Sequence, residues 1–127
     1  MIIAYDFDGT IVENEFPAIG NPRKGCRYAT VIDDLIALRK KGHKLILWTC
    51  REGEHLQQAV EFCRERGLEF DAINDDLEET KQEFADKLEI WKTSGRARKV
   101  FANYYVDDRA IGLLDENFLM GYCGLYE

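Results

Sequence analysis

The sequence predicts an α/β fold built on a parallel sheet, and three observations support this prediction. Short apolar runs alternate with segments of helical periodicity along the chain. The chain has 127 residues and contains no Pro-, Gly- or Ser-rich linker, so residues 1–127 are expected to form a single domain. Buried strands joined by helices favour a sheet covered on both faces, because right-handed crossovers place the helices there. We therefore expect a three-layer, Rossmann-like domain.

Four short apolar runs are the predicted strands. They are residues 2–5, 45–48, 70–73 and 100–106. The segment 110–122 leaves room for a short fifth strand, although its glycines and aromatic residues blur the period.

The helices are predicted between these runs. The first has apolar residues at helical spacing within 31–36, with Thr30 as the N-cap and Gly42 as the stop. The second has one apolar face over residues 56–63 and ends at Gly67. A third helix is expected within 75–95, with its start undefined. Each helix can serve as a crossover between strands.

Composition narrows the classes of function. The formal charge of −7 repels polyanions, so nucleic acid is a poor partner. No apolar stretch approaches the ~20 residues of a membrane helix. The four cysteines are widely spaced and form no C-x-x-C motif, and no leader peptide is visible, which indicates reduced thiols in a cytoplasmic protein. A small molecule is the favoured partner.

Acidic residues follow two of the predicted strands. Asp6 and Asp8 come at the end of the first strand, and Asp107 and Asp108 end the fourth. The carboxyl ends of parallel strands share one edge, so four carboxylates should converge there. Like charges 4 Å apart repel by about 4 kcal/mol at an effective dielectric near 20, which calls for a cation or for protonation. An all-oxygen site suits Mg²⁺. The alternative for Asp6 and Asp8 is a solvated Asp-Gly turn.

These residues fall in a recognisable order. Asp6-Phe7-Asp8-Gly9-Thr10, then Thr49 after the second strand, Lys99 before the fourth and Asp107-Asp108 after it resemble the four motifs of the haloacid dehalogenase superfamily. The resemblance covers residues 6–108. It implies a sheet of strand order 5-4-1-2-3 and phosphoryl transfer through an aspartyl phosphate.

The resemblance also implies a role for each motif residue. Asp6 would attack phosphorus and Asp8 would act as general acid and base, while its backbone carbonyl ligates the metal. Thr49 and Lys99 would hold the phosphoryl oxygens. The metal ligands would be Asp6, Asp8, Asp107 and Asp108. The sequence does not indicate which of the last two binds the metal directly.

Alternatives stay open for three residues. Thr49 could instead cap the helix that begins near Glu52, and Lys99 could be a solvated surface charge. Arg51 has a fork suited to phosphate but could equally pair with Glu52 or Glu54. Together with Gly9, Arg51 is included among the residues expected at the phosphate.

The connection after the first motif is short for this superfamily. Only residues 13–28 lie where a substrate-recognising cap is usually inserted, so no sizeable cap fits. The turn-rich stretch 16–25 could border the pocket and present Arg23 or Lys24 to an anionic substrate, or could be a plain connecting loop.

The sequence therefore predicts a Mg²⁺-dependent phosphomonoester hydrolase that acts on a small phosphorylated substrate. Asp8 argues against the dehalogenases and phosphonatases of the superfamily, which usually lack this second carboxylate. The alternatives are a receiver-like phospho-signalling module, whose acidic residues occur in a different order, and a non-catalytic protein that binds Mg²⁺ and a phosphorylated ligand. The sequence leaves the substrate, the oligomeric state and the presence of catalysis open.

Overall fold

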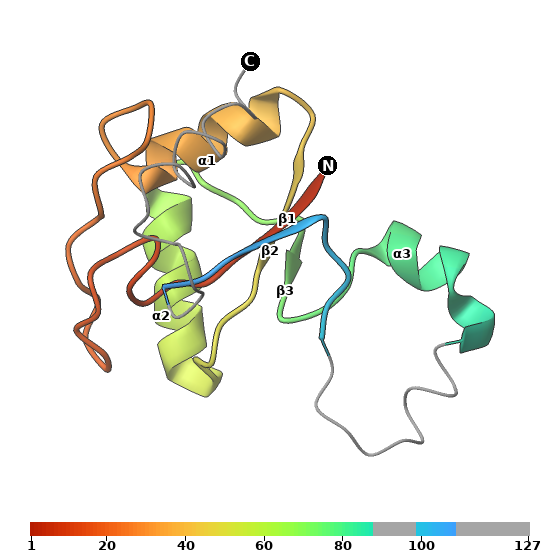
Figure 1. Cartoon of the computed structure of the whole chain (residues 1–127). Coiled ribbons are helices and arrows are strands. Elements are labelled where there is room, and N and C mark those ends of the chain that lie inside the picture. The colour runs from red at the N-terminus through yellow and green to blue at the C-terminus, as the bar shows by residue number, and fades with distance from the viewer. Residues whose placement is uncertain (88–98, 109–127) are drawn as a thin grey trace.

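The computed structural model describes residues 1–87 and 99–108 and contains a four-stranded parallel sheet (Figure 1). The strands are β1 (Ile2–Tyr5), β2 (Lys44–Leu47), β3 (Ala72–Ile73) and β4 (Tyr104–Val106), in the order β3-β2-β1-β4. The predicted α/β class with a parallel sheet is confirmed. The fifth strand considered within 110–122 lies outside the described residues.

Two helices cross between neighbouring strands as predicted. Helix α1 (Val31–Lys40) begins at Thr30, whose side chain accepts the Asp33 N–H in a capping box. Helix α2 (Gly53–Glu65) is followed by Gly67, whose φ of +85° suits a residue without a side chain. Helix α3 (Glu78–Glu83) is shorter than predicted, and the expected helical stretch 88–95 lies outside the described residues.

The two faces of the sheet carry separate apolar clusters. Alternate side chains point to opposite faces, so Ile3 and Tyr5 join the larger cluster with α1 and α2, whereas Ala4 packs in the smaller cluster. The chain moves in one direction from β1 to β3, and right-handed crossovers therefore place both helices on the same side. Leu77, just before α3, packs in the smaller cluster.

Strand β4 begins later than the sequence predicted. Residues 100–103 are not part of the strand. Asn103 binds Ile2 instead, accepting its N–H at 2.7 Å through the side chain and donating its own N–H to the Ile2 carbonyl at 2.7 Å. Val100 is buried in the smaller cluster. The apolar run 100–106 therefore consists of a non-strand segment that packs against the sheet, followed by the strand itself.

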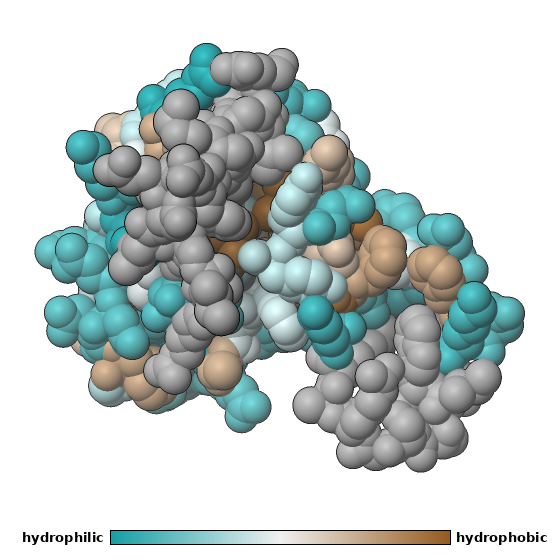
Figure 2. All heavy atoms as spheres, viewed as in Figure 1, coloured by the Kyte–Doolittle hydropathy of each residue, from teal (hydrophilic) through white to brown (hydrophobic). Residues whose placement is uncertain are grey.

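On the face shown in Figure 2, many of the described side chains are hydrophilic, and hydrophobic ones appear near the middle, at the lower left and on the right. Among the described residues, no helix combines the length and apolar character needed to cross a membrane.

The cysteines differ from expectation at one position. Cys50 and Cys63 are free thiols, as predicted, but Cys26 is disulfide-bonded. Spacing along the chain does not report which segments meet in the fold, so the sequence pattern gave no sign of this bond.

Candidate active site

The chain turns sharply where β1 ends. Asp6 extends the ladder, because its N–H donates to the Val106 carbonyl at 3.0 Å. Phe7 is fully buried, and its carbonyl accepts the N–H groups of Thr10, Ile11 and Val12. The Phe7 N–H donates to Asp6 Oδ1 at 2.8 Å. This buried anchor fixes the backbone on both sides of Phe7, and both Asp6 and Asp8 line one cavity.

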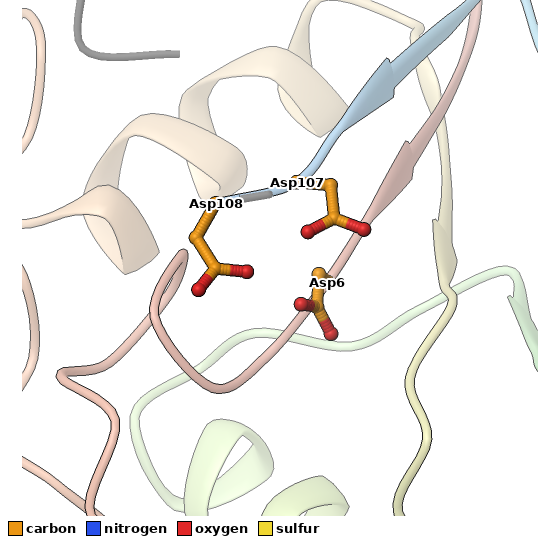
Figure 3. A group of neighbouring side chains, drawn as sticks. All are labelled: Asp6, Asp107 and Asp108. Carbon is orange, nitrogen blue, oxygen red and sulfur yellow. The ribbon is translucent and has the colours of Figure 1, made fainter. Parts of the chain in front are cut away.

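Three carboxylates meet at the carboxyl ends of β1 and β4. The side chains of Asp6, Asp107 and Asp108 each offer an oxygen, and these oxygens lie within 4.8 Å of one another (Figure 3). All three residues are half-buried. The adjacent parallel strands hold them together, since Tyr5 pairs with Val106 immediately before them. Three of the four carboxylates that were predicted to converge therefore meet in the structure, and the Asp8 carboxylate is not part of this group.

Asp6 carries an altered acidity in this setting. The pKa of Asp6 is raised from 3.8 to about 7, and burial of the carboxyl group is the largest cause. The charges of Asp107 and Asp108 and a hydrogen bond with Asp108 contribute to this rise, while the Phe7 N–H opposes it. Asp6 is thus partly protonated at neutral pH without a cation. Positive charge brought into this cluster would lower its pKa.

Gly9 lets Asp108 approach the turn. Its φ is +83°, and a Cβ there would lie 2.3 Å from Asp108 Oδ2. Any side chain at this position would have to displace the carboxylate. The requirement for glycine in the first motif is thus steric as well as conformational.

Asp8 faces a different partner from Asp6. Its two carboxylate oxygens accept hydrogen bonds from Arg51, with Nε–Oδ2 and Nη2–Oδ1 distances of 2.8 Å each. The Arg51 side chain is fully buried. This two-point geometry fixes the orientation of the Asp8 carboxylate. Neither alternative from the sequence, a phosphate partner or pairing with Glu52 or Glu54, anticipated this contact.

Arg51 also binds three backbone carbonyls around it. It donates through Nη2 to Ala18 at 2.8 Å, and through Nη1 to Pro17 at 3.4 Å and His55 at 3.3 Å. One buried side chain therefore joins the first motif, the loop after β1 and the first turn of α2. Such a guanidinium is tolerated in the interior because its donors are occupied.

Thr49 follows β2 and lines the same cavity. Its hydroxyl oxygen accepts the Arg51 N–H at 3.1 Å, and its own N–H donates to Asn74 Oδ1 at 2.7 Å. Asn74 follows β3 with a φ of +50°, and its N–H donates to the Leu47 carbonyl. The hydroxyl thus orders the turn before α2, and its hydrogen is still available to a ligand oxygen.

These side chains surround an open cavity of about 580 Å³. Its lining consists of Asp6, Asp8, Asn14, Phe16, Thr49, Cys50, Arg51 and Asp108. Gly9 adjoins it through its contact with Asp108.

Lys99 is not among the lining residues of this cavity. Its Nζ lies 4.4 Å from the centre of the Tyr105 ring, a cation–π distance. The Tyr105 hydroxyl donates to the Val100 carbonyl at 2.6 Å, which holds the ring in place. In the structure Lys99 thus contacts Tyr105 and does not line the cavity that Asp6, Asp8, Thr49 and Arg51 share.

The loop after β1 borders the cavity through Asn14 and Phe16, one of the two roles considered for it. Arg23, offered as a substrate contact, donates instead to the Gly9 carbonyl. Lys24 pairs through the backbone with Thr30, and the residue is exposed. Of these two basic residues, Arg23 thus has a side-chain contact within the fold, and neither lines the cavity.

Two features of the site, the Asp8–Arg51 pair and the position of Phe16, had no clear signal in the sequence. The Asp8–Arg51 pair joins residues 43 apart, and only the T-x-R spacing of Thr49 and Arg51 hinted that both could face the cavity. Asn74, by contrast, directly follows the third predicted strand, and its place at the sheet edge was predicted from the sequence. Phe16 lies in a turn-rich segment, and the spacing of residues does not predict how such a segment packs.

The arrangement is suited to chemistry on an anion. One carboxylate lies in an acidic group that can accept a divalent cation, and a second is fixed by a buried arginine in the same cavity. A hydroxyl stands beside them. Oxygen ligands of this kind match the preference of Mg²⁺, so the residues present fit that ion.

A solved structure similar to this chain is that of a conserved protein from Bacteroides thetaiotaomicron. The two chains share 39% sequence identity and align with a TM-score of 0.70 over 97% of this chain and 88% of the other. No family model and no curated protein matches the chain.

Proposed function

The chain belongs to the same family as this conserved Bacteroides protein, and we propose that it is a Mg²⁺-dependent phosphomonoester hydrolase of the haloacid dehalogenase type. The observation that carries the proposal is the meeting of Asp6, Asp107 and Asp108 beside the separately held Asp8. The strand order β3-β2-β1-β4 is compatible with the order 5-4-1-2-3 of that superfamily. The fifth strand and the complete third layer are part of the proposal.

Asp6 is the proposed nucleophile. A carboxylate oxygen forms a bond to phosphorus while the bond between phosphorus and the ester oxygen breaks, which leaves an aspartyl phosphate. Water then attacks this phosphorus, the bond to Asp6 breaks, and inorganic phosphate is released. Asp6 must be ionised for the first step, and its pKa of about 7 leaves only part of it ionised at neutral pH until positive charge enters the cluster.

Asp6, Asp107 and Asp108 would hold Mg²⁺, with the Asp8 carbonyl as a further proposed ligand. The chemistry that the ion supplies in such sites is charge neutralisation and alignment of the phosphoryl oxygens. The Asp8 carboxylate lies outside the acidic cluster because it is bound to Arg51.

Asp8 is the proposed general acid and base. It protonates the departing ester oxygen and later removes a proton from the attacking water. Arg51 holds it through two hydrogen bonds, so the carboxyl keeps one orientation through both steps. Arg51 is therefore a positioning residue in this proposal, and direct contact with phosphate would require it to loosen its hold on Asp8.

Thr49 is proposed to donate its hydroxyl hydrogen to a phosphoryl oxygen. Lys99 is proposed to neutralise the same group, which requires its ammonium to leave the Tyr105 ring. A cytoplasmic location is also proposed from the sequence, and the disulfide at Cys26 counts against it.

The test is turnover of p-nitrophenyl phosphate by the purified full chain with Mg²⁺ or with EDTA. We expect Mg²⁺-dependent release of phosphate, and a loss of about 10³-fold or more in kcat for Asp6→Asn. Asp86→Asn, on the exposed surface next to α3, is the matched control and should retain wild-type turnover. Full activity of Asp6→Asn would overturn the assignment of the nucleophile.

A second measurement addresses the covalent intermediate. Asp8→Asn should slow hydrolysis of the aspartyl phosphate, so intact-mass spectrometry should detect one added phosphoryl group that is absent from Asp6→Asn. Binding of phosphate esters without turnover of any of them would instead support the non-catalytic alternative.

A further inference from the structure

The loop after β1 places an aromatic ring at the rim of the proposed active site. Phe16 is 54% exposed, yet it lines the same cavity as Asp6 and Thr49. Hydrophobic surface appears at the lower left of Figure 2, the region that this loop and the start of α2 occupy in Figure 1. An exposed phenylalanine is unremarkable alone, but this one lines the cavity that contains the proposed phosphate site.

The ring is held on a loop that is fixed at its base and near its tip. The Glu13 N–H donates to the Asn21 carbonyl at 2.8 Å and closes the base. The carbonyl of Ala18 accepts from the buried Arg51 at 2.8 Å. Arg51 Cζ lies 5.1 Å from the centre of the Phe16 ring. The ring is therefore pre-positioned, which lowers the entropy lost when a ligand packs against it.

The His55 ring supports Phe16 from another direction. The two ring centres lie 5.4 Å apart at an angle of 65°, an edge-to-face arrangement. Phe16 thus has a guanidinium and an imidazole as neighbours and still leaves half of its surface to the solvent. This remaining surface is available to a third group.

The charges of the cavity restrict what that group can be. Of the described residues that line it, Arg51 is the one cation, and it is fully buried and bound to Asp8. The exposed residues that line the cavity are Asn14, Phe16 and Cys50, which we call its outer wall, and none of them is charged. Arg23 lies beside the cavity but donates to the Gly9 carbonyl. The described outer wall itself thus offers no cation to a second anionic group.

On the premise of the proposed function, we infer that the substrates are monophosphate esters whose leaving group presents a planar ring to Phe16. Stacking of the ring on Phe16 places the ester phosphorus toward Asp6. A leaving group that carries another phosphate finds no counter-charge on the described wall, and a flexible polyol offers no flat surface to the ring.

The test uses three alkyl phosphates that share a primary-alcohol leaving group. Benzyl phosphate has a planar ring, cyclohexylmethyl phosphate has a saturated ring of the same size, and glycerol 3-phosphate has none. We expect kcat/KM to be about three- to tenfold higher for the benzyl than for the cyclohexylmethyl ester, and lowest for glycerol 3-phosphate. Equal values for the two ring esters would overturn the stacking proposal.

Variants locate the effect. Phe16→Ala should reduce the benzyl-to-cyclohexylmethyl ratio to near one, whereas Phe16→Trp should preserve or increase it. Phe101→Ala is the matched control, because Phe101 is 47% exposed and is absent from the cavity lining, so the ratio should stay at the wild-type value. A ratio unchanged in Phe16→Ala would overturn the assignment of Phe16.

Binding separates this inference from the proposed function. The dissociation constants of benzylphosphonate and cyclohexylmethylphosphonate can be measured by calorimetry without turnover. A preference for the benzyl compound that Phe16→Ala removes, combined with no hydrolysis of any ester, would contradict the proposed hydrolase activity and support the binding of a planar ring by Phe16. Hydrolysis of all three esters without a preference for the planar ring in turnover or binding would support the hydrolase activity and contradict the role of Phe16.

Discussion

Asp6 and Asp8 are two residues apart, and the surroundings of their carboxylates contrast sharply. Asp6 lies among two further carboxylates, and its pKa is raised to about 7. Asp8 is bound through both oxygens to a buried guanidinium. The carboxylates around Asp6 therefore carry an excess of negative charge that a cation can neutralise. The negative charge of Asp8 is already neutralised by Arg51. The contrast shows how one short motif can supply two carboxylates for different tasks.

The largest expected effect is a loss of stability when the Asp8–Arg51 pair is broken. Arg51→Met leaves Asp8 without its partner and three backbone carbonyls without their donor, so the free energy of unfolding should fall by about 3–5 kcal/mol. Urea denaturation measures this loss. Arg39→Met is the control, because the Arg39–Asp71 ion pair is partly exposed and should contribute less than about 1 kcal/mol. Similar losses in both variants would contradict the burial of the Asp8–Arg51 pair.

A smaller loss of stability is expected from a substitution at Gly9, which Asp108 contacts. Gly9→Ala adds a Cβ that would lie 2.3 Å from Asp108 Oδ2, at a φ of +83°. Gly42→Ala has a φ of +95° with no atom within 4 Å of the added Cβ, so it carries only the conformational cost of about 1–2 kcal/mol. We expect Gly9→Ala to be about 1–2 kcal/mol more destabilising than Gly42→Ala in thermal or urea unfolding. Equal losses would show that Asp108 does not approach Gly9.

The smallest effect is the pH dependence of the acidic side. The folded-state pKa of Asp6, about 7, exceeds its ordinary value of 3.8, so the folded protein binds more protons between these values. Stability should therefore fall as the pH rises from about 4 to 7 in EDTA, by about 1–2 kcal/mol from this group after allowance for solvent screening.

Two controls identify the source of that slope. Asp6→Asn should flatten it, whereas Asp86→Asn, a change of one exposed carboxylate, should leave it unchanged. Adding Mg²⁺ should restore stability at the upper end of the range if the ion binds the carboxylates. A slope of the same size in Asp6→Asn would assign the effect to other groups.

Much of the fold could be predicted because its signals are local or follow from sheet topology. Apolar runs located the four strands, and Thr30 gave the start of α1 through its capping chemistry. The meeting of Asp6 with Asp107 followed from the rule that parallel strands end at one edge.

The missed features depend on how loops pack. Nothing in the spacing of Asp8 and Arg51 shows that the loop after β1 encloses the guanidinium and turns it toward the first motif. The Asp8 carboxylate was accordingly expected to converge with the other three, but it lies outside the acidic cluster. The metal ligand that the resemblance implies at Asp8 is its backbone carbonyl, and this stays a prediction. The disulfide at Cys26 was missed for the same reason, because loop packing sets which thiols meet.

The pairing of β1 with β4 bears on how the chain folds. Ile2 and Asn103, which bind each other beside this pairing, are 101 residues apart in the sequence. Closing so long a loop is entropically costly and slow compared with forming α1 against β2. A folding chain that has joined β1, β2 and β3 lacks Asp107, Asp108 and the Val106 carbonyl that accepts the Asp6 N–H. We therefore expect the acidic cluster to form late in folding, when the first and fourth strands pair.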